Sequence, residues 1–259
     1  MNFDAKFKLV KRASVKNIIA IPSYNEIDAL PVLISNISLK LSSEDLIIVL
    51  DDSDYLVSKK LEDSVKMNFK NSKGQLVFLN FGKKNGRGAA VRKGMELSRI
   101  YFPNFKYFIE CDADESHQVA DILKIKNYSE DSDMLIGSRY LRDSLIVNWP
   151  LLRRIFSKIL NLLIPFLLNI NVTDITNGLR RYNNKSVNYI LNFKQLNFGF
   201  TYLSETALII TAMNLKILEI PIIFVNRNRG NSTVGLKEIY SSIQGVFFLL
   251  IKKQKFYEG

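Results

Sequence analysis

The chain has 259 residues, with 36 Lys and Arg against 25 Asp and Glu, for a formal net charge of +11. This excess of positive charge favours an anionic partner, which can be nucleic acid, a phosphorylated ligand or an anionic membrane surface. The length suits one large α/β domain with a substantial core. The single cysteine excludes an internal disulfide, and no Cys/His cluster has zinc-site spacing, so we expect a reducing compartment.

The apolar stretches are too short for a transmembrane helix. The longest are residues 159–168 and 246–251, whereas a spanning helix needs about 20 predominantly apolar residues. Residues 1–6 are polar and lack the apolar core of a signal peptide. We therefore expect a cytoplasmic protein that lies on a membrane surface without crossing it.

Short apolar runs separated by helical patterns predict buried strands. The predicted strands are residues 16–21, 45–50, 75–79, 105–109 and 132–137. Strands that alternate with helices at this spacing predict a mostly parallel sheet with helices on both faces. Polar residues follow several of these strands, at the edge where ligands of open α/β sheets bind.

Two helix starts follow predicted strands. The first strand stops at Pro22, and an apolar-periodic helix is expected from Asn25 to Ile37. Gly86 and Gly88 follow the third strand but do not complete a dinucleotide-binding fingerprint, which requires a third small residue and normally follows the first strand. We interpret this loop as a basic helix start near a phosphate or a sugar, and a plain turn is the alternative.

An acidic pair, Asp112 and Asp114, follows the fourth predicted strand. If the strand geometry persists, both carboxylates point the same way and can bind one hard divalent cation. Ala113 between them leaves room for a bulky ligand. An acidic turn without a ligand is the alternative, and the polar residues at neighbouring strand ends favour the metal site.

The second part of the chain contains amphipathic helices. Residues 150–169 predict a helix with a cationic start and an apolar body, interrupted by Pro165. This profile is typical of a bilayer interface, and a buried core helix is the alternative. Residues 217–225 predict an edge strand because Pro221 lies inside it. The chain closes with a helix from about residue 236 that is apolar in its middle, basic toward its end and again interfacial in profile.

A series of motifs in this order resembles the GT-A glycosyltransferases of family 2, most closely their polyprenol-phosphate (dolichol-phosphate) mannosyltransferase branch. The motifs are Ile-Pro-Ser-Tyr-Asn-Glu at 21–26, Asp51-Asp52, Asp112-Ala113-Asp114 followed by Ser116-His117, Ile136-Gly137-Ser138-Arg139-Tyr140, Asp174 with Thr176-Asn177-Gly178-Leu179-Arg180, Gly199-Phe200 with Glu205, and Arg227 with Gly230 and Ser232. The resemblance spans about residues 16–233. It implies a GT-A catalytic domain over 1–233, with the apolar acceptor-side helix 150–169 inserted, and a C-terminal amphipathic helix over 234–259.

The same resemblance implies roles for individual residues. The nucleotide sugar would be bound by Pro22, Tyr24, Glu26, Asp52, Asp112 and Arg227. A divalent ion, Mg²⁺ or Mn²⁺, would be bound by Asp112 and Asp114, with Ser116 as a weak third ligand, directly or through water. The catalytic set would be Asp114 with the residues expected to bind the phosphate of the lipid acceptor, Arg139, Arg153 and Ser157. The chain departs from the family pattern at residues 53–56, which bears on the base and ribose contacts, and at Thr233.

These roles imply inverting transfer of a hexose, foremost mannose, from a nucleotide sugar to a polyprenyl phosphate at the cytoplasmic face of an anionic membrane. The metal would neutralise charge on the departing nucleoside diphosphate. A lipid monophosphate, with a second ionisation near pH about 6, is already a nucleophile and needs no general base. GDP-mannose is the favoured donor, and a UDP-sugar is the alternative.

Two other functions remain as alternatives. A transferase acting on a polysaccharide or glycolipid hydroxyl would need a catalytic base, for which Glu205 and Asp174 are the candidates. A nucleic-acid binder is disfavoured because the basic residues are scattered and do not alternate with aromatic residues as in a base-stacking surface. We therefore expect no nucleic-acid partner, and the sequence predicts no oligomeric state.

Overall fold

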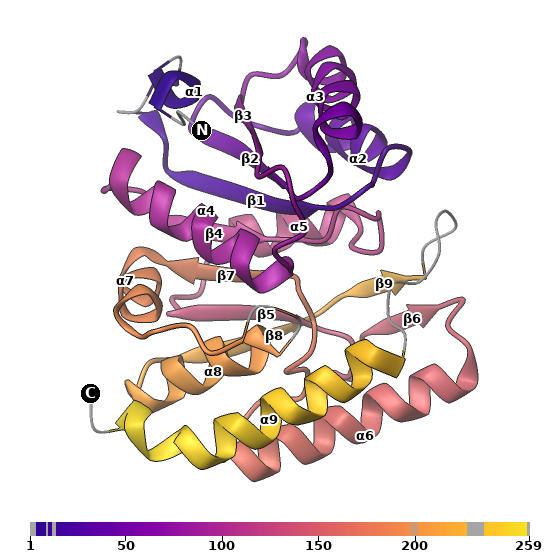
Figure 1. Ribbon diagram of the computed structural model, residues 1–259, viewed down its shortest axis with the longest axis vertical. Coiled ribbons are helices and arrows are strands. Elements are labelled where there is room, and N and C mark those ends of the chain that lie inside the picture. The colour runs from indigo at the N-terminus through magenta and orange to yellow at the C-terminus, as the bar shows by residue number, and fades with distance from the viewer. Residues whose placement is uncertain are drawn as a thin grey trace.

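A computed structural model describes residues 4–8, 10–11, 14–197, 199, 201–226 and 236–257, with the backbone alone for 236–243 (Figure 1). At its centre is a seven-stranded sheet in the order β3-β2-β1-β4-β7-β5-β8, and β6 pairs with β9 in a small second sheet. The strands are β1 Asn17–Ser23, β2 Asp45–Asp51, β3 Gln75–Asn80, β4 Tyr107–Glu110, β5 Met134–Ser138, β6 Leu145–Val147, β7 Arg180–Asn183, β8 Ile217–Pro221 and β9 Ile223–Val225. The helices are α1 Asp4–Lys8, α2 Ala29–Ser38, α3 Tyr55–Phe69, α4 Arg87–Tyr101, α5 Val119–Asn127, α6 Leu151–Leu168, α7 Asn184–Asn192, α8 Tyr202–Ala212 and α9 Leu236–Tyr257.

The central sheet is mostly parallel, as the sequence predicts. Strand β1 pairs in parallel with β2 and β4, β2 with β3, and β5 with β8. All five predicted strands are present, and β1 continues through Pro22 to Ser23, past its predicted end. Since parallel strands end at the same edge of a sheet, the segments that follow β1, β2 and β4 lie next to one another, where ligands of open α/β sheets bind.

Strand β7 lies antiparallel between β4 and β5, in a segment for which the sequence analysis predicts no strand. Two of its residues, Arg180 and Arg181, are charged but buried. A search for runs of apolar residues therefore does not detect this strand. Their guanidinium groups donate to backbone carbonyls of the surrounding elements, namely those of Ile175, Asn177 and Leu203 for Arg180 and of Ile125 and Tyr128 for Arg181. These bonds offset the cost of burying two cations in the sheet.

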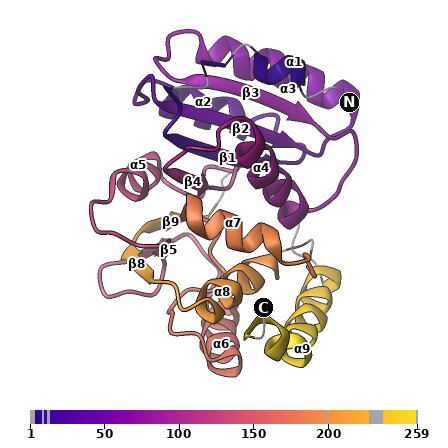
Figure 2. The same cartoon turned by 90° about the vertical axis from the view of Figure 1, so that its left-hand side faces the viewer.

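Helices cover both faces of the sheet (Figures 1 and 2), and their buried side chains make two separate cores. Successive residues of a strand point to opposite faces, so Ile18 and Ala20 of β1 join the core that contains α4, α7 and α8. Ile19 and Ile21 join the other core, which contains α2, α3 and α5. Burial on both faces explains why the parallel strands have continuous apolar sequences.

Two predicted boundaries differ from the structure. Helix α2 begins at Ala29 rather than Asn25, because Asn25 adopts a left-handed conformation with φ of 59° and is part of the turn after β1. The predicted strand 217–225 divides at Ile222 into β8 and β9, which belong to different sheets. Strand β8 is an edge strand, as Pro221 predicts.

Helices α6 and α9 lie side by side at the end of the molecule opposite α3 (Figures 1 and 2). Helix α6 confirms the helix predicted over 150–169, but the predicted interruption at Pro165 is wrong. Proline removes only one backbone donor near the end of the helix, and the amide of Ile170 closes the last turn on the Pro165 carbonyl. Asn169, with φ of 56°, ends the helix.

Both of these helices expose large apolar side chains. The exposed residues are Leu151, Leu152, Ile155, Phe156, Ile159, Leu162, Leu163, Phe166 and Leu167 on α6, and Phe247, Phe248, Ile251 and Tyr257 on α9. No helix in the described part of the chain combines the length and the hydropathy that a membrane span requires.

A buried ion pair joins α5 to β2 and gives a test of the fold. The Asp45 carboxylate is fully buried and lies 2.7 Å from Lys126 Nζ. We expect Asp45→Asn to lower the free energy of unfolding by roughly 3 kcal/mol in denaturant titrations, because it leaves a buried cation unpaired. Glu130→Gln removes the exposed pair with Lys216 and should leave the unfolding midpoint unchanged. An equal effect of both variants on the unfolding midpoint would contradict the assignment of Asp45 and Lys126 as a stabilising buried ion pair.

The effect of Asp45→Asn depends on pH. Burial acts to raise the pKa of Asp45, but hydrogen bonds from Lys126, the Ser42 amide and Asn17 outweigh it, and the pKa is lowered. A lowered pKa gives a stabilisation that is complete above the ordinary Asp value of about 3.9 and is lost as the pH falls through the folded-state pKa. The stability difference between wild type and variant should therefore shrink as the pH falls below about 4.

Candidate active site

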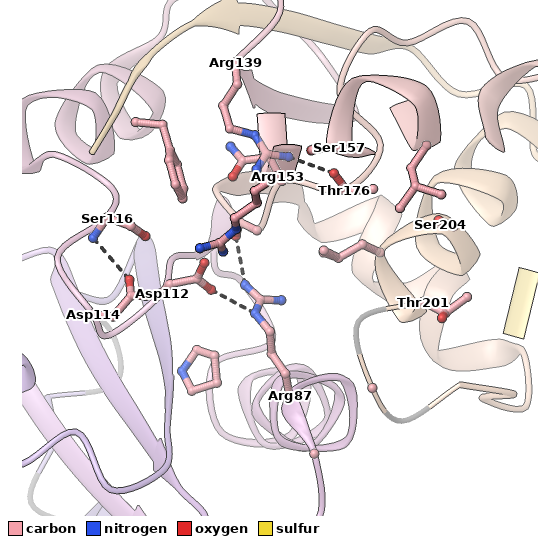
Figure 3. Close-up of a pocket in the computed structure, with 18 of the residues that line it drawn as sticks. Arg87, Asp112, Asp114, Ser116, Arg139, Arg153, Ser157, Thr176, Thr201 and Ser204 are labelled. Atoms are coloured by element: carbon pink, nitrogen blue, oxygen red, sulfur yellow. Dashed lines mark hydrogen bonds and ion pairs between the residues drawn. The ribbon is translucent and has the colours of Figure 1, made fainter. Parts of the chain in front are cut away.

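A cavity of about 890 Å³ lies where β1, β2 and β4 end and continues along α6 (Figure 3). Its walls include all the site residues predicted from the sequence that the structure describes, namely Pro22, Tyr24, Glu26, Asp52, Asp112, Asp114, Ser116, Arg139, Arg153 and Ser157. The remaining predicted residue, Arg227, lies outside the described residues. Segments far apart in the chain therefore contribute to one site.

The acidic pair lies just after β4. The strand ends at Glu110, but its alternation continues, with Cys111 and Ala113 buried and Asp112 and Asp114 partly exposed to the cavity. Both carboxylates are thus on one side, as predicted. The Asp114 carboxylate accepts a hydrogen bond from the backbone amide of Ser116 at 3.1 Å, and Glu115 makes this tight turn with φ of 61°.

Arg87, at the start of α4, holds the first carboxylate of the pair. Its Nε donates to Asp112 Oδ1 at 2.9 Å and its Nη1 to Glu110 at 2.9 Å. It also donates to the Tyr202 hydroxyl and to the Gly178 carbonyl. Burial acts to raise the pKa of Asp112, but the charge of Arg87 outweighs it and lowers the pKa, so Asp112 is ionised at neutral pH.

His117 supports Asp112 from the other side. Its Nδ1 accepts a hydrogen bond from the backbone amide of Asp112 at 3.1 Å. The other nitrogen, Nε2, therefore carries the proton and donates to Asn177 Oδ1 at 2.9 Å, while the Asn177 amide group donates to the Gly137 carbonyl. This chain of bonds fixes the tautomer with the proton on Nε2, and it holds His117 against the backbone of the acidic loop.

The oxygens around the acidic pair fit a hard divalent cation. Asp112 Oδ2 accepts no hydrogen bond from the described residues, and Ser116 Oγ is buried beside the cavity without a partner among them. Within the described part of the chain, no group of three His, Cys, Asp or Glu side chains is arranged to hold a metal. Two carboxylates, a hydroxyl and oxygens from a ligand or water make an oxygen set of the kind Mg²⁺ and Mn²⁺ prefer.

Arg139 is buried in the cavity wall and is paired with Asp174. Its Nε and Nη2 donate to the two oxygens of Asp174 at 2.7 and 2.8 Å, and Nη2 also donates to Thr176 (Figure 3). The third nitrogen, Nη1, donates no hydrogen bond to a described residue. Two of the three guanidinium nitrogens are thus already occupied, which the sequence did not predict.

Arg153 and Ser157 lie one turn apart on α6 and face the cavity together. Arg153 Nη1 donates to Asn226 at 3.3 Å, and the Ser157 hydroxyl accepts from the Tyr140 hydroxyl at 2.7 Å. Apart from Arg153 and Ser157, the part of the cavity wall that α6 contributes is apolar. The apolar lining residues are Leu152, Phe156, Leu160, Leu163, Ile164 and Leu167 of α6, Leu203 of α8 and Val246 of α9.

At the other end of the cavity, Asp52 organises the loop that leads into α4. Its carboxylate accepts hydrogen bonds from the amides of Asn85 and Gly86 and from the Asn85 side chain. Burial raises the pKa of Asp52 despite these bonds. Lys84 from this loop lies 4.8 Å from the ring centroid of Tyr24. The loop predicted as a basic helix start therefore lines the cavity.

The two candidate bases of the hydroxyl-acceptor alternative lie outside the cavity lining. Asp174 is fully buried and bound to Arg139. Glu205 accepts hydrogen bonds from the amides of Leu196 and Asn197 and from the Asn197 side chain. Both carboxylates are bound by neighbouring protein groups, and neither lines the cavity.

The structure adds cavity residues that the sequence analysis did not select. They are Ser23, Lys84, Arg87, Trp149, Asn177, Phe224 and the apolar residues of α6. The α6 residues are mostly four positions apart, so an analysis of helical periodicity in the sequence could have identified them. Trp149 and Phe224 come together only through the tertiary structure.

We use the name Arg87 clamp for the hydrogen bonds by which Arg87 holds Asp112 and Glu110. A substitution at Gly178 tests this clamp. A Cβ at Gly178 would collide with Arg87 Nη2 and approach Asp112 Oδ1 to 3.0 Å. We expect Gly178→Ala to lower Mn²⁺ affinity roughly tenfold, because a displaced supporting group misaligns a metal ligand. Free Mn²⁺ is measured by electron paramagnetic resonance.

Gly199→Ala is the matched control, since this glycine also lines the cavity and a Cβ there meets nothing within 4 Å. Its Mn²⁺ affinity should equal that of the wild type. If Gly178→Ala bound Mn²⁺ as tightly as the control, the clamp would not support the metal site.

Comparison with known proteins gives the relatives of the chain. It is similar to the undecaprenyl-phosphate mannosyltransferase of Micrococcus luteus, with 29% identity over 222 residues, 83% of this chain and 86% of that protein. It is also similar to the polyprenol monophosphomannose synthase of Mycolicibacterium smegmatis, with 27% identity over 227 residues, 86% of this chain and 83% of that protein.

A solved structure with a similar fold is glucosyl-3-phosphoglycerate synthase from Mycobacterium tuberculosis in complex with Mn²⁺, UDP-glucose and phosphoglyceric acid, with a TM-score of 0.59. The match covers 94% of this chain and 81% of that chain at 16% identity, so the likeness concerns the fold. The sequence profile of glycosyl transferase family 2 matches residues 18–191. The chain therefore belongs to glycosyl transferase family 2 and has the GT-A fold that its motifs predict.

Proposed function

We propose that this glycosyltransferase moves a hexose, foremost mannose, from a nucleotide sugar to a polyprenyl phosphate with inversion of the anomeric centre. One observation carries the proposal, namely a continuous cavity with an acidic pair at one end, arginines in its middle and an apolar wall beyond them. The relatives named as polyprenol-linked mannosyltransferases support the same acceptor and sugar. GDP-mannose is the first donor to test, and a UDP-sugar is the second.

The donor end of the site binds the nucleotide diphosphate. A divalent ion held by Asp112, Asp114 and Ser116 would act as a Lewis acid on the diphosphate as it leaves. Arg87 holds the Asp112 carboxylate and His117 holds the Asp112 backbone amide, so little reorganisation is needed when the donor binds. The Mn²⁺ in the structurally similar synthase supports this use of the acidic pair.

The acceptor end of the site binds an anionic phosphate. Arg153 and the Nη1 group of Arg139 can donate charge-assisted hydrogen bonds to its oxygens, and Ser157 lies one helical turn further. A phosphate monoester is already charged at neutral pH, so it attacks without giving up a proton. The absence of Asp174 and Glu205 from the cavity lining supports this acceptor over a hydroxyl, which would need a base.

The apolar part of the cavity then takes the first part of the hydrocarbon tail. The exposed apolar side chains of α6 and α9 continue this surface to the outside of the molecule. Lys158 on α6 and Lys255 on α9 add positive charge close to them. We infer peripheral binding of these two helices to the cytoplasmic face of an anionic membrane, where the head of a polyprenyl phosphate is presented.

The reaction is tested by incubating the protein with GDP-mannose, Mn²⁺ and a short polyprenyl phosphate and identifying the product by mass spectrometry. We expect a mannosyl phosphoprenol of inverted anomeric configuration and no transfer to the corresponding prenol. Arg153→Ala should raise the KM for the acceptor at least about tenfold, because a hydrogen bond to a charged group is lost. Glu205→Gln should keep most of the activity. Transfer to a hydroxyl, with activity lost in Glu205→Gln and kept in Arg153→Ala, would overturn the proposal.

Membrane binding is tested by cosedimentation with vesicles that contain anionic lipid. The side chains of Phe166 and Phe247 are 81% and 65% exposed. We expect either Phe→Glu change to weaken vesicle binding by about tenfold or more, since it removes a large apolar side chain from the interface. Met67→Glu on α3, where Met67 is 67% exposed, should bind vesicles like the wild type. Equal binding by all variants would contradict this docking surface.

A further inference from the structure

Trp149, the single tryptophan of the chain, contacts both arginines of the proposed acceptor site. The guanidinium carbon of Arg153 lies 4.6 Å from its ring centroid, and that of Arg139 lies 5.2 Å from it. Both distances are within the range of a cation–π interaction. Trp149 lines the cavity together with these arginines and just precedes α6, and Figure 3 shows the two arginines in that cavity.

The indole ring is itself held in place by aromatic packing. Phe224 of β9 meets it edge-on, with centroids 5.3 Å apart and an interplanar angle of 70°. Phe224 also packs against His117, with centroids 5.5 Å apart, and lies 5.2 Å from the guanidinium carbon of Arg139. The ring therefore connects the acceptor end of the site to the histidine that supports Asp112.

The polar group of Trp149 does not explain its position. A buried indole N–H usually has a hydrogen-bond partner, but Nε1 of Trp149 is buried and has none among the residues that the structure describes. The contacts that hold the side chain are those of its ring with Arg139, Arg153 and Phe224. The face of the ring is thus the part of the residue that interacts.

A neutral ring suits a site that must bind a dianion. Two cations next to one cavity repel each other until an anion arrives. A carboxylate that orients a guanidinium group also cancels part of its charge and competes with the phosphate, as Asp174 does on two nitrogens of Arg139. An aromatic face orients a guanidinium with a weak attraction and leaves its positive charge in place.

We propose that Trp149 is a positioning residue of the acceptor site, whose ring face holds Arg153 and Arg139 ready for the phosphate monoester of the acceptor. The inference rests on the proposed function, since it takes this phosphate as the ligand of the two arginines.

The single tryptophan makes the proposal testable by fluorescence without catalysis. Farnesyl phosphate, added in the absence of donor, should produce a saturable change in the emission of Trp149. Farnesol, which has the tail without the phosphate, and GDP with Mn²⁺, which has the diphosphate, should produce little change. Arg153→Met should abolish the response. An equal response to farnesol, or an unchanged response in Arg153→Met, would overturn the proposal.

Two substitutions of Trp149 separate its ring face from its N–H group. Trp149→Leu should raise the KM for farnesyl phosphate about tenfold, the loss expected for a desolvated cation–π contact. The donor KM should stay unchanged and kcat should stay close to that of the wild type. Trp149→Phe keeps a ring face without the N–H, so it should restore most of the acceptor affinity.

Folding is checked by the melting temperature and by GDP binding with Mn²⁺, which both variants should retain. If Trp149→Phe were as defective as Trp149→Leu, or if the donor KM rose with the acceptor KM, the positioning role would be wrong. A phosphate-dependent fluorescence response without transfer to farnesyl phosphate would leave the anion site standing and refute the proposed function. Transfer without such a response would refute only the role of Trp149.

Discussion

The site depends on one buried guanidinium group. Glu110 is fully buried at the end of β4 and Asp112 lies two residues further along the chain, and two negative charges this close repel each other unless a cation lies between them. Arg87 supplies the cation and donates to both, and it also binds the Tyr202 hydroxyl and the Gly178 carbonyl. One charge thus joins the start of α4, the end of β4, the start of α8 and the segment before β7 beneath the cavity.

Hydrogen bonding to the protein divides the charged groups in and next to the cavity into two kinds. Asp52, Asp174 and Glu205 have their oxygens bound by neighbouring protein groups, so they define shape. Asp112 Oδ2 and Arg139 Nη1 make no hydrogen bond to a described residue and line the cavity, so they are available to ligands. A site with one available negative region and one available positive region suits a metal-bound donor and an anionic acceptor, with the sugar between them.

The sequence predicts the strands of this fold well because a parallel sheet buried on both faces requires continuous apolar runs. It fails at β7, since Arg180 and Arg181 are satisfied by carbonyls from distant segments that no local pattern contains. The described residues to which the sequence analysis gave a site role line one cavity, but their partners were not predictable. The bond from Arg139 to Asp174 joins residues 35 positions apart, and the contacts of Trp149 depend on how β9 meets the start of α6.

The close approach of Gly178 to Arg87 restricts how these two positions can change among relatives. A side chain at this position would occupy the space of the Arg87 guanidinium group, so the two residues constrain each other. A larger residue at position 178 displaces the Arg87 guanidinium group from Asp112, so a lineage that keeps this hydrogen bond is expected to keep glycine there. The two positions are therefore expected to covary among homologues in spite of their separation in the chain.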